Sequence, residues 1–208
     1  MNIEQLFKNN REWIENKLRS DSQYFEKLAA GQQPKILYIG CSDSRVTVEE
    51  ILGLEPGEAF VHRNVANLVN NVDLNVMSVI NYALDHLNVD HVVICGHYNC
   101  GGVKAAMQSV DLGILNPWLR NIRDVYRMHM DELNAISDEA KRYDRLVELN
   151  VEEQCVNVLK TAAVQRGVRN RGVTVHGWVF DLRNGMVKDL QIDFQNKLEK
   201  IREIFRLD

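Results

Sequence analysis

The fold is indicated first by a stretch near the end of the first quarter of the chain, KILYIGCSDSR at residues 35–45. Its first half is a short apolar and β-branched run, typical of a strand buried on both faces. Similar runs follow at residues 59–62, 91–95, 173–180 and 187–192. The segments between them carry apolar residues at helical spacing, so the pattern predicts an α/β fold with a mostly parallel sheet flanked by helices. The Arg-Asn-Gly turn at 183–185 predicts a final hairpin with an antiparallel edge strand.

The length of 208 residues suits a single domain with appended helices. We expect an N-terminal helical arm at residues 1–30, a catalytic α/β core at 31–193 and a C-terminal helix at 194–208. The arm is amphipathic, with apolar residues such as Leu6, Phe7 and Ile14 at helical spacing. The stretches 114–136 and 138–166 carry alternating charges and apolar residues at helical spacing.

Composition and charge exclude several functional classes. The net charge of -4 provides no basic field for nucleic acid. No stretch approaches the roughly 20 apolar residues that span a bilayer, and charges interrupt the N-terminal segment from its fourth position. Four cysteines without an export signal favour a reducing compartment. The sequence therefore predicts a cytoplasmic protein without nucleic-acid or membrane partners.

Two polar clusters follow predicted strands directly. Cys41 comes after the first strand, and His97 and Cys100 come after the strand at 91–95. The carboxyl ends of parallel strands meet at one edge of the sheet, so the clusters should converge in one crevice. Either motif alone is as well explained by buried thiols and a loop histidine. Together, two thiolates and one imidazole suit zinc, and three ligands with an open fourth position are typical of a catalytic site.

Asp43 and Arg45 lie beside the first predicted ligand. A carboxylate paired with a guanidinium stays ionised and only accepts hydrogen bonds. Asp43 would then orient a hydroxyl donor at the metal, and Arg45 would keep Asp43 from becoming a fourth ligand. The alternative is a surface ion pair that contributes under about 1 kcal/mol.

These motifs resemble those of the β-class carbonic anhydrases. The resemblance rests on CSDSR at 41–45, PGE at 56–58, HRNVAN at 62–67, CGHYNCGG at 95–102 and HGW at 176–178. It implies one Zn²⁺ per subunit, held by Cys41, His97 and Cys100, with Asp43 and Arg45 as the catalytic dyad. The implied reaction is reversible hydration of carbon dioxide to bicarbonate by zinc-hydroxide attack.

The resemblance also implies a substrate pocket and an oligomer. The pocket positions match Gln32, Phe60, Val65, Tyr82 and Gly101, with the glutamine amide and the glycine N–H holding substrate near zinc. In the family, the N-terminal helices embrace a partner subunit. We therefore expect self-association as a dimer or tetramer.

The sequence departs from one branch of that family. Bicarbonate-inhibited bacterial members carry a Trp–Arg–Tyr set at a second bicarbonate site, where this chain has Tyr38, Arg63 and Phe180. Two hydrogen-bond donors of that site are thereby lost, so we expect no such inhibition and a structural role for Arg63.

Two alternatives remain open. A carbon disulfide or carbonyl sulfide hydrolase on the same scaffold would share the motif chemistry. A non-catalytic zinc-binding regulatory module would instead close the metal's coordination with a fourth ligand. A comparison of substrates distinguishes the first, and absence of turnover supports the second.

Overall fold

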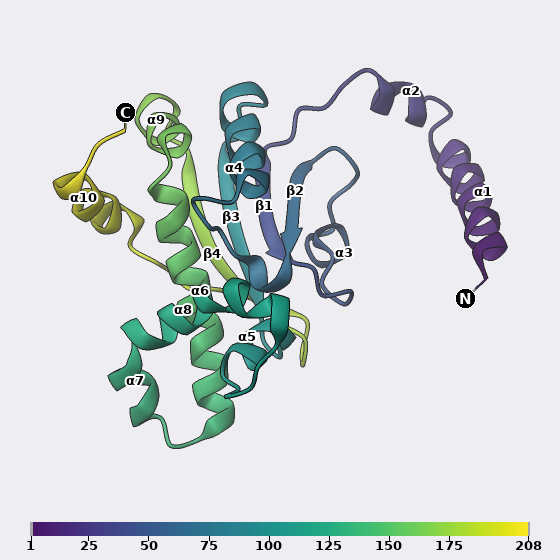
Figure 1. Cartoon of the computed structure of the whole chain (residues 1–208). Helices are drawn as coiled ribbons and strands as arrows, with labels where there is room; N and C mark the ends of the chain where they lie inside the picture. Colours follow the sequence, from purple (N-terminus) through teal and green to yellow (C-terminus); the bar gives the residue numbers. More distant parts are fainter. Residues whose placement is uncertain (1, 208) are drawn as a thin grey trace. The chain divides into compact units, whose positions relative to one another are not determined.

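The computed structural model describes residues 2–207, and the chain divides between Gln33 and Pro34 into two compact units. The first unit contains helices α1 (Ile3–Ser20) and α2 (Tyr24–Ala29) (Figure 1). Asn2 caps the start of α1, and its side chain accepts a 3.2 Å hydrogen bond from the N–H of Glu4. Within this unit, Trp13 packs edge-on against Phe25, with ring centroids 5.4 Å apart. No residue described in α1 is buried within this chain.

The second unit is built on a five-stranded sheet of order β2-β1-β3-β4-β5. Its strands are β1 (Ile36–Cys41), β2 (Ala59–Asn64), β3 (His91–His97), β4 (Thr174–Asp181) and β5 (Met186–Asp189). Strands β1 to β4 are parallel to one another, and β5 pairs antiparallel with β4. The predicted fold class and the antiparallel edge strand are confirmed.

Helices connect and cover these strands. They are α3 (Val48–Leu52), η1 (Val65–Asn67), α4 (Leu74–Asn81), η2 (Tyr82–His86), α5 (Gly101–Ala106), η3 (Gly113–Leu115), α6 (Asn116–Met128), α7 (Met130–Ala135), α8 (Glu139–Leu159), α9 (Ala162–Arg171) and α10 (Phe194–Ile204). The two long stretches at 114–136 and 138–166 are helical, as their spacing predicts, but each contains a break. The first breaks at His129, and the second breaks at Thr161, whose side chain accepts a hydrogen bond from the N–H of Val164 and starts α9.

The two faces of the sheet pack against hydrophobic cores of different size. Leu37 and Ile39 face the main core together with residues of α4, α6, α8 and α9, whereas Tyr38 faces a smaller core that includes residues of α3. Helix α8 lies so close to β3 that a Cβ on Gly96 would be 2.6 Å from Cγ2 of Val151. Glycine at this position therefore permits the helix to pack against the end of the strand.

The strand order places a switch point between β1 and β3. The chain leaves β1 toward β2 on one side and later returns to β3 on the other side. Ligands bind at such points, beyond the carboxyl ends of the strands. Among the residues described, no helix is long and apolar enough to cross a membrane.

Candidate active site

Three side chains converge at the β1/β3 switch point. Cys41 ends β1, His97 ends β3, and Cys100 follows three residues later. Their ligand atoms all lie within 4.8 Å of one another, and all three side chains are buried. In the part of the chain that the structure describes, no other group of three His, Cys, Asp or Glu residues has this geometry. The convergence predicted from the strand ends is thus present.

The ring of His97 is oriented by its own backbone neighbour. Its Nδ1 lies 2.9 Å from the carbonyl oxygen of Tyr98, which can only accept, so Nδ1 carries the proton. Nε2 is fully buried and has no hydrogen-bond partner among the described residues. A buried nitrogen lone pair beside two thiols fits a soft tetrahedral cation, and a backbone carbonyl on the other nitrogen is the usual support of a metal-bound histidine. The residues present therefore fit Zn²⁺.

The two thiols lose one proton readily and share the proton that remains. Their sulfur atoms are 3.9 Å apart. The hydrogen bond from Cys100 lowers the pKa of Cys41, although burial opposes this effect. The same hydrogen bond and burial raise the pKa of Cys100. A dication would displace the remaining proton, because cysteine binds metals as the thiolate.

The loop after β3 turns sharply to bring Cys100 beside His97. Asn99 makes this turn with a φ of 58°, a left-handed conformation that asparagine tolerates better than most residues. The N–H of Tyr98 donates to the carbonyl of Phe180 (3.0 Å), and the hydroxyl of Tyr143 donates to the carbonyl of Cys100 (2.6 Å). Contacts from β4 and α8 thus hold both ends of the loop.

The loop after β1 carries the predicted dyad. Arg45 donates to both oxygens of Asp43, from Nε at 2.9 Å and from Nη2 at 2.7 Å, and its backbone N–H adds a third bond at 3.0 Å. These bonds hold the pKa of Asp43 well below its usual range, although burial opposes them. Oδ2 of Asp43 lies 3.8 Å from Nε2 of His97. An ionised acceptor therefore stands beside the ligand cluster.

Arg63 on β2 fastens this loop to the sheet. Its Nε donates to the carbonyl of Cys41 at 2.8 Å, and its Nη2 donates to the carbonyl of Asp43 at 2.5 Å. Tyr38 and Phe180 lie in the smaller core, where the Tyr38 hydroxyl is buried without a partner among the described residues. The geometry of Arg63 supports the predicted structural role, and the absence of bicarbonate inhibition stays a prediction.

The predicted pocket residues are distributed over several elements. The rings of Phe60 and Tyr82 pack with centroids 5.7 Å apart, and Tyr82 is half-exposed. Val65 begins η1 and is also partly exposed, and Gly101 begins α5 directly after Cys100. Gln32 belongs to the N-terminal unit. Their contacts with substrate stay predictions.

Sequence reasoning missed Tyr98 and Tyr143 as supports of the site. Tyr98 stands inside the His-x-x-Cys motif, and this position was a signal that its backbone carbonyl could orient His97. Tyr143 carried no local signal, because the charged stretch around it reads as an exposed helical face and its contact with Cys100 spans 43 residues.

The fold and site together define a class of α/β proteins with a metal-compatible Cys–His–Cys centre at the sheet's switch point. A family model described as carbonic anhydrase matches residues 36–187. A carbonic anhydrase of Emericella nidulans is 59% identical over 205 residues, covering 98% of this chain and 90% of that protein. The chain belongs to the carbonic anhydrase family, in its β class.

Solved structures agree with this assignment. The β-carbonic anhydrase CafA of Aspergillus fumigatus is 39% identical, with a TM-score of 0.93 and coverage of 99% of both chains. A tetrameric β-carbonic anhydrase of Sordaria macrospora is 41% identical, with a TM-score of 0.88 and coverage of 91% of this chain and 96% of that one.

Proposed function

We propose that this protein catalyses the reversible hydration of carbon dioxide to bicarbonate, with one Zn²⁺ held by Cys41, His97 and Cys100. The observation that supports this most directly is the buried, partnerless Nε2 of His97 beside two thiols. When bound, Zn²⁺ supplies Lewis acidity that activates water as a nucleophile near neutral pH. Cys41, His97 and Cys100 would hold the ion with three protein ligands, the number typical of a catalytic zinc site.

Asp43 orients the nucleophile in this proposal. Because its pKa is held low by Arg45, the carboxylate is ionised at neutral pH and accepts a hydrogen bond from the O–H of the attacking oxygen. The oxygen lone pair is then directed toward the carbon of carbon dioxide. Arg45 occupies both carboxylate oxygens of Asp43 and so restrains the side chain from moving onto the metal.

The proposed pocket binds a small apolar gas. Phe60, Val65 and Tyr82 provide apolar surface, while the backbone N–H of Gly101 holds an oxygen atom of substrate or product. These assignments are supported by the family membership of the chain and by the Phe60–Tyr82 ring pair.

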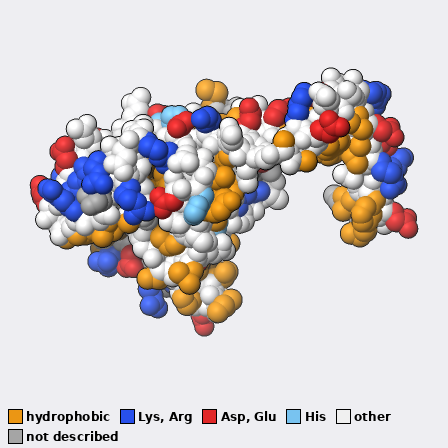
Figure 2. All heavy atoms as spheres, turned by 90° about the horizontal axis from the view of Figure 1, so that it is seen from above, with side chains coloured by type: hydrophobic (Ala, Val, Ile, Leu, Met, Phe, Trp, Pro, Cys, Tyr) orange, Lys and Arg blue, Asp and Glu red, His pale blue; other side chains and the backbone are white. Residues whose placement is uncertain are grey.

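We further propose that the active form is at least a dimer, in which the N-terminal helices pack on a partner subunit. Helix α1 exposes Ile3, Leu6, Phe7, Trp13 and Leu18. Figure 2 shows hydrophobic side chains gathered on the surface of this helical unit. Such a concentration of apolar surface is typical of an interface, and the Sordaria macrospora relatives are tetrameric.

Stopped-flow hydration of carbon dioxide by zinc-loaded protein tests the proposal. The matched control is Cys155→Ala, which removes a buried thiol outside the cluster, and it should keep activity that Cys100→Ala loses. The same samples are offered carbonyl sulfide and carbon disulfide. Hydrolysis of either without hydration of carbon dioxide would overturn the proposal, and zinc binding without any turnover would favour a regulatory module.

A further inference from the structure

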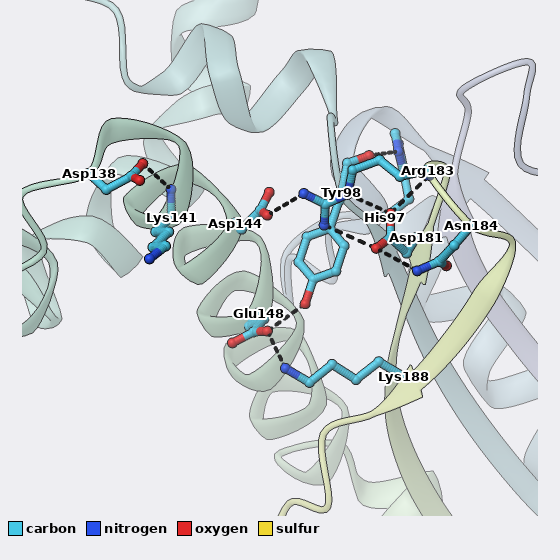
Figure 3. A network of polar contacts seen from close by, with 10 residues as sticks. All are labelled: His97, Tyr98, Asp138, Lys141, Asp144, Glu148, Asp181, Arg183, Asn184 and Lys188. Atoms are coloured by element: carbon cyan, nitrogen blue, oxygen red, sulfur yellow. Dashed lines mark hydrogen bonds and ion pairs between the residues drawn. The ribbon is translucent and has the colours of Figure 1, made fainter.

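A network of polar side chains surrounds Tyr98, the residue that follows His97. The Tyr98 hydroxyl donates to Oε1 of Glu148 on α8 at 2.6 Å. On the other side, the guanidinium of Arg183 lies 4.9 Å from the centre of the Tyr98 ring. Figure 3 shows the ring between these two side chains. Tyr98 is thus held from α8 and from the β4–β5 hairpin.

Both partners of Tyr98 are themselves fixed. Lys188 of β5 and Arg145 of α8 donate to Glu148, at 2.6 and 3.0 Å. These bonds and the one from Tyr98 keep the pKa of Glu148 below its ordinary value, although burial opposes them, so it remains a charged acceptor. A hydrogen bond to an ionised acceptor is roughly twice as strong as a neutral one.

Arg183 is anchored equally firmly. It donates from Nε to Asp181 at 2.8 Å and from Nη1 to Asp144 at 3.0 Å, so it bridges the hairpin and α8 (Figure 3). The guanidinium therefore has a fixed position over the aromatic face of Tyr98, where a cation is attracted by the ring.

The contacts of Tyr98 with Glu148 and Arg183 help to fix the position of the Tyr98 backbone carbonyl. It accepts a hydrogen bond from Nδ1 of His97 at 2.9 Å, and the contacts of the Tyr98 side chain restrain the backbone that carries this carbonyl. Because Tyr98 also donates its N–H to Phe180, both its backbone and its side chain are restrained. The rotation of the His97 ring, and with it the direction of Nε2, follows from this restraint.

We propose that Tyr98 is a positioning residue for the metal ligand His97, and that Glu148 and Arg183 act through it. The Tyr98 clamp, consisting of these three side chains, selects the His97 tautomer with Nδ1 protonated and aims Nε2 at the two thiols. This inference rests on the proposed function, since it assigns the clamp to the proposed zinc centre.

The test compares Tyr98→Phe with Tyr126→Phe in the full-length protein. Tyr98→Phe removes only the hydroxyl that reaches Glu148. Tyr126→Phe is the matched control, because its hydroxyl also donates to a side-chain oxygen (Asn134, 2.8 Å) but lies on α6. Zinc Kd is measured by chelator competition, and the ¹⁵N shifts and Nδ1–H exchange of His97 are measured in metal-free protein.

We expect Tyr98→Phe to raise the zinc Kd about 10-fold, as loss of support around a ligand usually does, and to speed exchange of the His97 Nδ1 proton. Tyr126→Phe should change neither. Glu148→Gln keeps an amide oxygen that accepts from Tyr98 and should retain most of the affinity, whereas Glu148→Ala should match Tyr98→Phe. If Tyr98→Phe does not fold, the comparison of Glu148→Gln with Glu148→Ala tests the clamp instead.

Wild-type zinc affinity and wild-type His97 signals in both Tyr98→Phe and Glu148→Ala would overturn the clamp. Carbon dioxide hydration by the wild type, measured on the same preparation, separates this result from the proposed function. An active wild type with unaffected Tyr98→Phe and Glu148→Ala variants rejects the clamp alone. An inactive wild type whose zinc affinity falls in Tyr98→Phe rejects the proposed reaction and keeps the clamp.

Discussion

Replacing Arg63 by methionine removes the two hydrogen bonds that fasten the Cys41–Arg45 loop to β2. The Arg63 side chain donates to the carbonyl of Cys41 at 2.8 Å and to that of Asp43 at 2.5 Å. Both of these acceptor residues belong to the proposed site. Methionine keeps a long apolar stem but has no donor. The substitution therefore tests the fastening with little change in side-chain volume.

The expected magnitude follows from the two bonds. A hydrogen bond with a charged donor contributes about 1.5–3 kcal/mol to stability. Without Arg63, each of the two carbonyls must accept a hydrogen bond from water or remain without a donor. Because Arg63 is only partly buried, we expect the lower end for each bond, a loss of about 3 kcal/mol in the free energy of unfolding. Arg63→Lys keeps one donor group and should recover about half of this loss.

Arg142→Met is the matched control. Arg142 also makes two hydrogen bonds to backbone, at 3.0 and 2.8 Å, but both go to the carbonyl of Ile136 at the α7–α8 turn. Urea unfolding and zinc Kd are measured for both variants at one protein concentration. Both should be less stable, and only Arg63→Met should also bind zinc more weakly. Unchanged stability and zinc affinity in Arg63→Met would refute the reasoning.

Three further predictions concern the metal, the dyad and pH. Alanine at Cys41, His97 or Cys100 should remove most bound zinc, because three ligands leave no redundancy. Near-stoichiometric zinc in any of these variants, measured by elemental analysis, would show that the replaced residue is not a ligand. Asp43→Asn keeps the shape of the side chain but not its charge, so the variant should retain zinc and lose at least 10-fold in kcat/KM, measured by stopped flow. Wild-type turnover in this variant would show that Asp43 and Arg45 form only a salt bridge. Wild-type kcat/KM should rise gradually from neutral to alkaline pH, because two thiolates cancel the formal charge of zinc and weaken its effect on water. The lowered pKa of Asp43 keeps that carboxylate ionised throughout this range, so it does not cause the rise; a steep rise that added bicarbonate shifts further alkaline would contradict the prediction.

The sequence by itself determined the strands and the metal-compatible cluster. Buried parallel strands need continuous β-branched and apolar runs, and these runs marked the positions of β1, β3 and β4 within a few residues. Cys41 and His97 each follow such a run directly, and parallel strands bring their carboxyl ends to one edge whatever the connecting helices do. Local pattern and one topological rule were therefore sufficient for this cluster.

Only the tertiary structure decided how that cluster is supported. The bonds from Tyr143 to Cys100 and from Tyr98 to Glu148 join residues 43 and 50 positions apart. They exist because α8 packs on the sheet with one particular rotation and axial position, which the close approach at Gly96 makes possible. Helical periodicity identifies the apolar face of α8, but a polar residue at the border of that face turns either to solvent or to the site. The packing of distant elements decides which of the two directions such a residue takes, because the position of α8 depends on side-chain volumes across the whole core.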